Sequence, residues 1–241
     1  MRTILRGVAV LLMFVHWPGS AADLSAFHAL YQLTSGSLTV GEISVSLDLS
    51  EGGRYRYYSE SKPTGLVGRL VGGRIEEESE GVLLQQSLRP ERYRYQREGR
   101  KKRTVQLKFD WAKQQVVNTI NNDPWTMRIE PGTMDKLAVQ LALMRDLKAG
   151  HNNLFYRVAD GGRMKDYRFS IVERGTIETS LGSLDVVRVR RDRGRNGRYT
   201  DLWCAEKLDF LPALVVQYRD GKEHARMTLQ RFDSTPIKHR S

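Results

Sequence analysis

Apolar and polar residues alternate along most of the chain, which is the period of a β-strand with one buried face. In the clearest run, the apolar members alternate with serine and aspartate: Ile43, Val45, Leu47 and Leu49. Short turn sequences separate such runs, as at Gly52-Gly53 and Asn196-Gly197. The pattern predicts about 14–15 strands. Short turns also require antiparallel neighbours.

One segment, about 133–149, has the period of an amphipathic helix. Thr133 is placed to act as its N-cap, Asp135 puts negative charge in its first turn, and Gly150 supplies the stop. Its apolar stripe consists of Met134, Leu137, Ala138, Leu141, Met144 and Leu147.

A sheet of this many strands must curl or close. We therefore predict a mainly β fold, in which a large antiparallel meander forms a half-open barrel or spiral. The helix is expected on the concave face of this sheet, as a plug or lid. Arg145, Asp146 and Lys148 predict a polar edge that stays in contact with water near its C-terminal end.

The first residues have the pattern of a secretory signal peptide, 1–22, with a basic start and an apolar run at 8–15 that is too short to span a bilayer. Small residues precede Asp23, where cleavage is expected. We expect a single β-rich domain over 23–241, with a short basic tail at about 234–241, located in the periplasm.

The chain has a formal net charge of +11, and without Arg2 and Arg6 of the signal peptide this becomes +11 − 2 = +9. In an exported protein we expect no nucleic-acid partner. Basic residues flank two predicted hairpin tips and form a candidate surface for an anionic envelope surface or a protein partner: Arg100, Lys101, Lys102, Arg103, Arg195 and Arg198. The same charges would also discourage edge-to-edge aggregation, and both interpretations stay open.

The sequence contains few residues that could form a metal, cofactor or catalytic site. The histidines are scattered and Cys204 is the only cysteine, so we expect no metal, no cofactor and no intramolecular disulfide. The Cys204 thiol is expected to be buried and inert. In the acidic run 76–80, Glu77 falls on the opposite strand face from Glu76, Glu78 and Glu80. We expect the latter three on a solvated outer face, and no catalytic constellation can be recognised.

The order and spacing of several short motifs resemble a family of exported Gram-negative proteins known only as a domain of unknown function. The matching features extend from about residue 27 to 232: Tyr31, Gly36, Gly41-Glu42, Leu88-Arg89-Pro90, Val105 to Asp110, Asp135, Gly182, Leu202-Trp203 and Leu211-Pro212. The resemblance implies an antiparallel half-open barrel or spiral, similar in style to periplasmic lipoprotein carriers and envelope-integrity proteins. It implies no catalytic residues, and the lone cysteine departs from disulfide-stapled spiral proteins.

Together these features favour a non-enzymatic periplasmic envelope protein that binds an amphipathic or lipid-like ligand within its curved sheet. The side chains expected to contact this ligand are Met134, Leu137, Leu141, Met144, Trp125, Phe155 and Trp203. One alternative is an adaptor or scaffold that docks through the basic hairpin tips. A second is a cell-wall or lipid hydrolase whose catalytic residues meet only in the folded chain.

Overall fold

A computed structural model describes residues 24–65, 73–85, 87–99, 101–194 and 197–234. The predicted signal peptide and most of the predicted tail lie outside the described residues. Fifteen strands form one sheet. Their bounds are β1 Phe27–Ser35, β2 Leu38–Ser50, β3 Arg54–Pro63, β4 Ile75–Leu83, β5 Leu88–Arg97, β6 Arg103–Asp110, β7 Gln115–Ile120, β8 Asp123–Arg128, β9 Met134–Asp135, β10 Leu154–Asp160, β11 Arg163–Thr179, β12 Gly182–Asp192, β13 Tyr199–Ala205, β14 Leu211–Arg219 and β15 Lys222–Asp233. The α-helix is α2, Ala138–Lys148, and two short 3-10 turns are η1, Glu51–Gly53, and η2, Glu206–Leu208.

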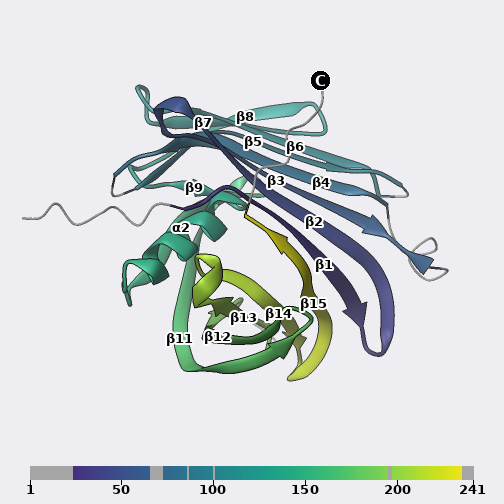
Figure 1. Cartoon of the computed structure of the whole chain (residues 1–241). Coiled ribbons are helices and arrows are strands. Elements are labelled where there is room, and N and C mark those ends of the chain that lie inside the picture. Colours follow the sequence, from purple (N-terminus) through teal and green to yellow (C-terminus); the bar gives the residue numbers. More distant parts are fainter. Residues whose placement is uncertain (1–23, 66–72, 86, 100, 195–196, 235–241) are drawn as a thin grey trace, which may run out of the picture.

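Strands that follow one another in sequence are neighbours in the sheet, with one exception. The two edges are β8 and β9, although they are consecutive in the chain, and β1 pairs with β15 in the middle. All pairs are antiparallel except β9 with β10. The sheet curls around so that its edges approach, but it is not closed by hydrogen bonds (Figure 1). This confirms the predicted half-open meander of about 14–15 strands. We call the gap between β8 and β9 the seam.

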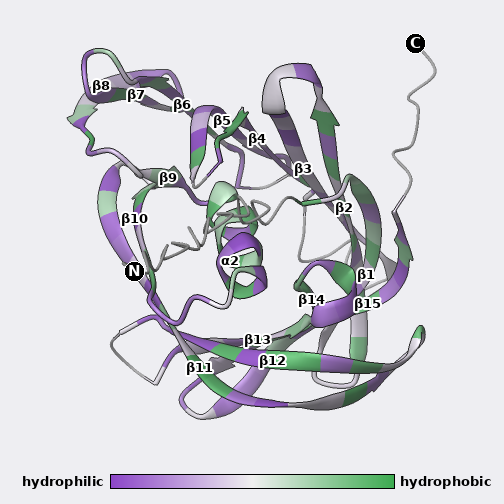
Figure 2. Ribbon diagram, turned by 60° about the vertical axis from the view of Figure 1, so that its left-hand side comes forward, coloured by the Kyte–Doolittle hydropathy of each residue, from purple (hydrophilic) through white to green (hydrophobic). Residues whose placement is uncertain are grey.

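The period-two pattern places one face of each strand in a shared core. On β2, Val45 and Leu47 are buried, and they face Tyr57 of β3 and Ala29 of β1 across the ladder. Figure 2 shows α2 in the middle of the ring formed by the strands. Eight of its residues are buried: Ala138, Val139, Leu141, Ala142, Leu143, Met144, Arg145 and Leu147. The sheet therefore uses the helix to fill its interior.

The helix is shorter than the predicted 133–149, and the prediction that Thr133 caps it is wrong. The Thr133 hydroxyl closes the preceding turn, because Oγ1 donates to the Glu130 carbonyl at 2.7 Å and accepts the Glu130 N–H at 3.2 Å. Met134 and Asp135 then form β9 beside β10. Gly150 has the expected left-handed backbone, with φ of 76° just beyond the helix.

Asp135 takes over the capping role. Its Oδ1 accepts the N–H groups of Leu137 and Ala138, both at 2.8 Å, which satisfies two donors at the start of α2. Its Oδ2 accepts the Ser79 hydroxyl of β4 at 2.6 Å. The side chain is fully buried, and this burial raises its pKa to about 6 in spite of the three hydrogen bonds.

Polar contacts fix the rest of the helix. Gln140 accepts the Tyr57 hydroxyl at 3.0 Å, and Asp146 accepts the Tyr156 hydroxyl at 2.6 Å. The prediction that Arg145 belongs to a wet edge is wrong. Arg145 is 7 % exposed and donates to three carbonyls of the segment that joins β4 to β5: those of Leu84, Gln85 and Ser87. Lys148 remains exposed, as expected.

We expect the pH dependence of stability to reveal Asp135. Its folded pKa of about 6 lies above the ordinary value of 3.8, so the folded state binds this proton more tightly than the unfolded state does. The stabilising contribution is present below pH 3.8 and is lost as the pH rises through 6, by an amount on the order of 3 kcal/mol. Urea unfolding of wild type and Asp135→Asn from pH 4 to 8 measures the difference.

The asparagine keeps an acceptor for the helix N–H groups but has no charge to bury. The free energy of unfolding of wild type should therefore fall relative to that of the variant between pH 4 and 6. Parallel pH profiles for the two proteins would contradict a buried, titrating Asp135.

Candidate functional site

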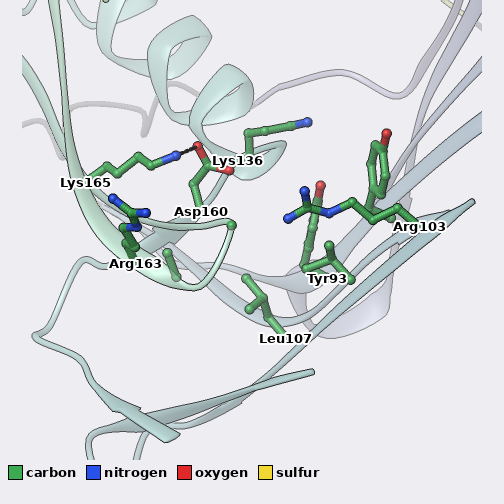
Figure 3. Close-up of a pocket in the computed structure, with 11 residues that line it drawn as sticks. Tyr93, Arg103, Leu107, Lys136, Asp160, Arg163 and Lys165 are labelled. Atoms are coloured by element: carbon green, nitrogen blue, oxygen red, sulfur yellow. Dashed lines mark hydrogen bonds and ion pairs between the residues drawn. The ribbon is translucent and has the colours of Figure 1, made fainter. Parts of the chain in front are cut away.

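A pocket of about 540 Å³ lies beside the seam, on the concave side of the sheet. One wall comes from β5 and β6, and the other from Lys136 in the β9–α2 connection and from the β10–β11 hairpin (Figure 3). The lining residues are Tyr93, Tyr95, Arg103, Val105, Leu107, Lys136, Ala159, Asp160, Gly161, Arg163 and Lys165. We call this cavity the seam pocket.

Trp125 of β8 closes the seam next to this pocket by packing on Gly162. Gly162 has φ of 81°, and a Cβ added there would lie 2.1 Å from Trp125 Cζ2. Only glycine allows an indole ring to lie this close to the backbone of the β10–β11 turn. The two edges of the sheet thus meet through a side chain instead of a hydrogen-bonded ladder.

We expect Gly162→Ala to destabilise the protein more than Gly161→Ala. Both glycines have a left-handed backbone, so alanine costs about 1 kcal/mol at each. At Gly161 the nearest atoms are 3.9 Å away, whereas at Gly162 the methyl group overlaps Trp125 and adds about 1–3 kcal/mol. Urea denaturation measures both losses. In a Trp125→Ala background the extra cost at Gly162 should disappear, and its persistence would contradict this contact.

Lys136 is the first cation of the seam pocket, and it is held in place. Its Nζ lies 2.9 Å from Glu77 Oε1 and 5.2 Å from the centre of the Tyr95 ring. The other Glu77 oxygen accepts the Tyr93 hydroxyl at 2.9 Å. Glu77 therefore lies on the inner face, as the alternation predicted, and it positions both a lysine and a tyrosine at the pocket.

Asp160 is the carboxylate within the pocket wall. It accepts Lys165 Nζ at 2.7 Å and the Tyr167 hydroxyl at 2.8 Å. Burial works to raise its pKa, but these two hydrogen bonds and the charges of Lys165 and Lys136 outweigh burial, so the pKa is lowered. Asp160 is therefore an ionised acceptor at neutral pH.

Arg103 and Arg163 carry the uncompensated charge. Neither has an acidic side chain within 4 Å among the described residues. Around one cavity the chain thus gathers four cations against Asp160, with Glu77 behind Lys136. Guanidinium groups pair with carboxylate or phosphate oxygens through several N–H donors. The arrangement is suited to binding an anionic group next to tyrosine, valine and leucine side chains.

The structure distributes the predicted ligand-contacting residues over three places. Met134, Leu137, Leu141 and Met144 are all packed in the core, each at most 6 % exposed. Trp125 lies at the seam. Phe155 is 44 % exposed beneath Arg168, and Trp203 packs under Arg188 on the sheet face that carries Asp201. Ligand contact by these seven residues stays a prediction.

Among the predicted basic residues, Arg103 lines the seam pocket. Lys101 and Lys102 are exposed in the β5–β6 turn, and Arg198 is exposed next to β13. Arg100 and Arg195 lie outside the described residues.

The sequence interpretation did not single out Lys136, Asp160, Arg163 or Lys165 as site residues. Three of these come from the hairpin around Gly161 and Gly162, two consecutive glycines with φ of 61° and 81°. A glycine pair between a carboxylate and a basic residue was the available signal, since it permits close approach of another segment.

Cys204 is free and buried, as expected, and burial raises the pKa of its thiol. Within the described ranges, no group of three or more His, Cys, Asp or Glu side chains lies close enough to hold a metal ion. In the same part of the chain, no helix is long and apolar enough to cross a membrane.

Comparison with known proteins agrees with this architecture. The family of proteins of unknown function DUF3108 matches residues 30–230. The chain belongs to the DUF3108 family. The resemblance seen in the sequence is thereby confirmed, and no characterised relative in the curated set matches the chain.

Solved structures relate this DUF3108 chain to others of low sequence identity. A β-barrel-like protein of the DUF1849 family from Brucella abortus superposes with a TM-score of 0.58 at 12% identity, covering 87% of this chain and 98% of that one. This likeness concerns the fold alone. A candidate lipoprotein from Parabacteroides distasonis (8% identity, 88% and 100% coverage) and an exported-type protein from Bacteroides fragilis (7%, 88% and 97%) reach only 0.41 and 0.37.

Proposed function

We propose that this DUF3108 protein is a non-enzymatic binding protein of the bacterial cell envelope, exported to the periplasm by its N-terminal segment. The proposed ligand is amphipathic, and its acidic group binds in the seam pocket. The observation that carries the proposal is the presence of Arg103 and Arg163, both without an acidic partner among the described residues, at a cavity of about 540 Å³. Cavities of this size are typical of small-molecule sites.

The composition of the walls supports an amphipathic ligand. On the β5–β6 side the half-buried Tyr95 ring and the 6 % of Tyr93 and Val105 that stays exposed contribute apolar surface to the cavity, and the cations lie around it. The interior beneath α2 is less suitable for an acyl chain, because Leu141 and Met144 are almost completely buried by protein there. We therefore propose that the ligand binds in the seam pocket and not against α2.

A binding role also suits the carboxylates of the seam pocket. Glu77 accepts from Lys136 and Tyr93, and Asp160 accepts from Lys165 and Tyr167. With its pKa lowered, Asp160 does not hold a proton to donate at neutral pH. Each carboxylate acts as a fixed acceptor that positions a cation.

Calorimetry with dihexanoyl phosphatidic acid, a water-soluble amphipathic anion, tests the proposal. Arg163→Glu should weaken binding at least tenfold, since it replaces an unpaired cation of the pocket by an anion. Arg231→Glu is the matched control, because Arg231 is exposed on β15 and has no acidic partner within 4 Å among the described residues. Absence of binding to wild type, or equal loss in both variants, would overturn the proposal.

The adaptor function remains a second candidate because predicted basic residues at both hairpin tips are exposed. Lys101 and Arg198 lie at different hairpin tips, and neither has an acidic side chain within 4 Å in the described part of the chain. Near an anionic membrane each basic residue contributes about 1 kcal/mol.

If the tips dock on such a surface, the double variant Lys101→Glu, Arg198→Glu should bind phosphatidylglycerol vesicles at least tenfold more weakly at low salt. Its affinity for dihexanoyl phosphatidic acid should be unchanged. Vesicle sedimentation measures the first quantity, and unchanged sedimentation would exclude docking through the tips.

A further inference from the structure

A second cavity of about 430 Å³ adjoins the seam pocket, and Arg103 lines both. Its other walls include Arg97, Lys102, Thr104 and Asn121, which lie on β5, on β6 and in the adjoining turns. We call it the tip pocket, because it lies towards the β5–β6 turn. Two cavities that share one arginine can accept two groups of a single ligand.

Arg97 and Arg103 are direct cross-strand partners in the β5–β6 ladder. Alternation puts Arg97 on the same face as Tyr93 and Tyr95, and Arg103 on the same face as Val105, so both arginines lie on the concave side. Like charges directly opposite each other destabilise a sheet. A pair of arginines in this position is favourable when an anion neutralises both.

The Arg97 guanidinium has a further unmet requirement. Its Nε is buried and has no hydrogen-bond acceptor among the described residues. Buried N–H donors nearly always have a partner, and Arg97 has no acidic side chain within 4 Å there, although Glu98 lines the same cavity. A negatively charged acceptor would satisfy both the unpaired Nε–H donor of Arg97 and its positive charge.

We propose that the seam binds a ligand carrying two phosphate-type groups, one in the seam pocket and one in the tip pocket, with Arg103 between them. The inference rests on the proposed function, because it uses the seam pocket as the first subsite. In the first subsite Arg163 and Lys136 complete the cationic wall, and in the second Arg97 and Lys102 do so. A single phosphate engages only one of these two sets.

Calorimetry compares inorganic phosphate with two compounds that each carry two phosphoryl groups at different separations, pyrophosphate and 1,6-hexanediol bisphosphate. We refer to both as bisphosphates. At least one bisphosphate should bind wild type tenfold or more tightly than phosphate does. Arg97→Gln should remove this advantage, while phosphate affinity changes less than twofold. Arg92→Gln is the matched control, because Arg92 lies on the same strand but on the opposite face, where it donates to Glu80 and lines neither pocket.

Arg97→Gln removes a like-charge pair, so its unfolding midpoint should equal or exceed that of wild type. Should it fail to fold, Lys102→Gln tests the same subsite and should reduce the advantage at least threefold. The inference is overturned if neither bisphosphate binds more tightly than phosphate, or if the advantage survives in the folded variant. If phosphate binding depends on Arg163 but neither bisphosphate binds more tightly than phosphate, only the present inference is overturned and the proposed function stands. If wild type binds none of the three compounds, both are overturned.

Discussion

The buried carboxylate of Asp135 is the constraint on which the rest of the fold depends. A helix enclosed by a curled sheet starts away from water, so its first N–H groups need acceptors from the protein. Asp135 supplies one oxygen to two of them and the other to Ser79, whose Oγ also lies 3.1 Å from the Tyr55 hydroxyl. One side chain thus joins β3, β4 and β9 to the helix. The raised pKa of Asp135 reflects the cost of burying this group.

The same arrangement leaves the sheet open. The chain leaves β8, turns, and contributes only two residues to β9 before the helix begins, so the edges are never paired. The Ile129 N–H donates to the Gln114 carbonyl, and by antiparallel alternation the backbone of Pro124 faces outward from the β7 ladder. Proline has no N–H to offer there, which protects the edge from pairing with another strand. Side-chain contacts such as Trp125 on Gly162 join the edges instead, and the seam pocket lies beside this contact.

Period-two alternation predicted the strands, their short connections and the inner position of Glu77, because these depend on local sequence. Helix bounds were predicted less well, since the choice of Thr133 or Asp135 as cap depends on Ser79, which is 56 residues from Asp135. The seam pocket could not be predicted from the pattern at all. Its cations Arg103, Lys136 and Arg163 belong to separate segments, and only the curl of the sheet brings them around one cavity. Residues singled out because they are large and apolar were instead used for packing, as Leu141 and Met144 illustrate.

The distribution of charged side chains over the two faces of the sheet supports the proposed anion-binding site. On the opposite face from the core, several basic residues are compensated: Arg56 pairs with Glu78, Arg92 with Glu80, and Arg190 with the fully buried Asp201. Glu78 and Glu80, which were expected on a solvated outer face, are thus neutralised by arginines of the neighbouring strands. Arg97 and Arg103 lie opposite each other on the concave face, and Arg97 Nε is buried with no acceptor among the described residues. A sheet retains such a pair at a cost in stability, and the anionic ligand that we propose would offset this cost.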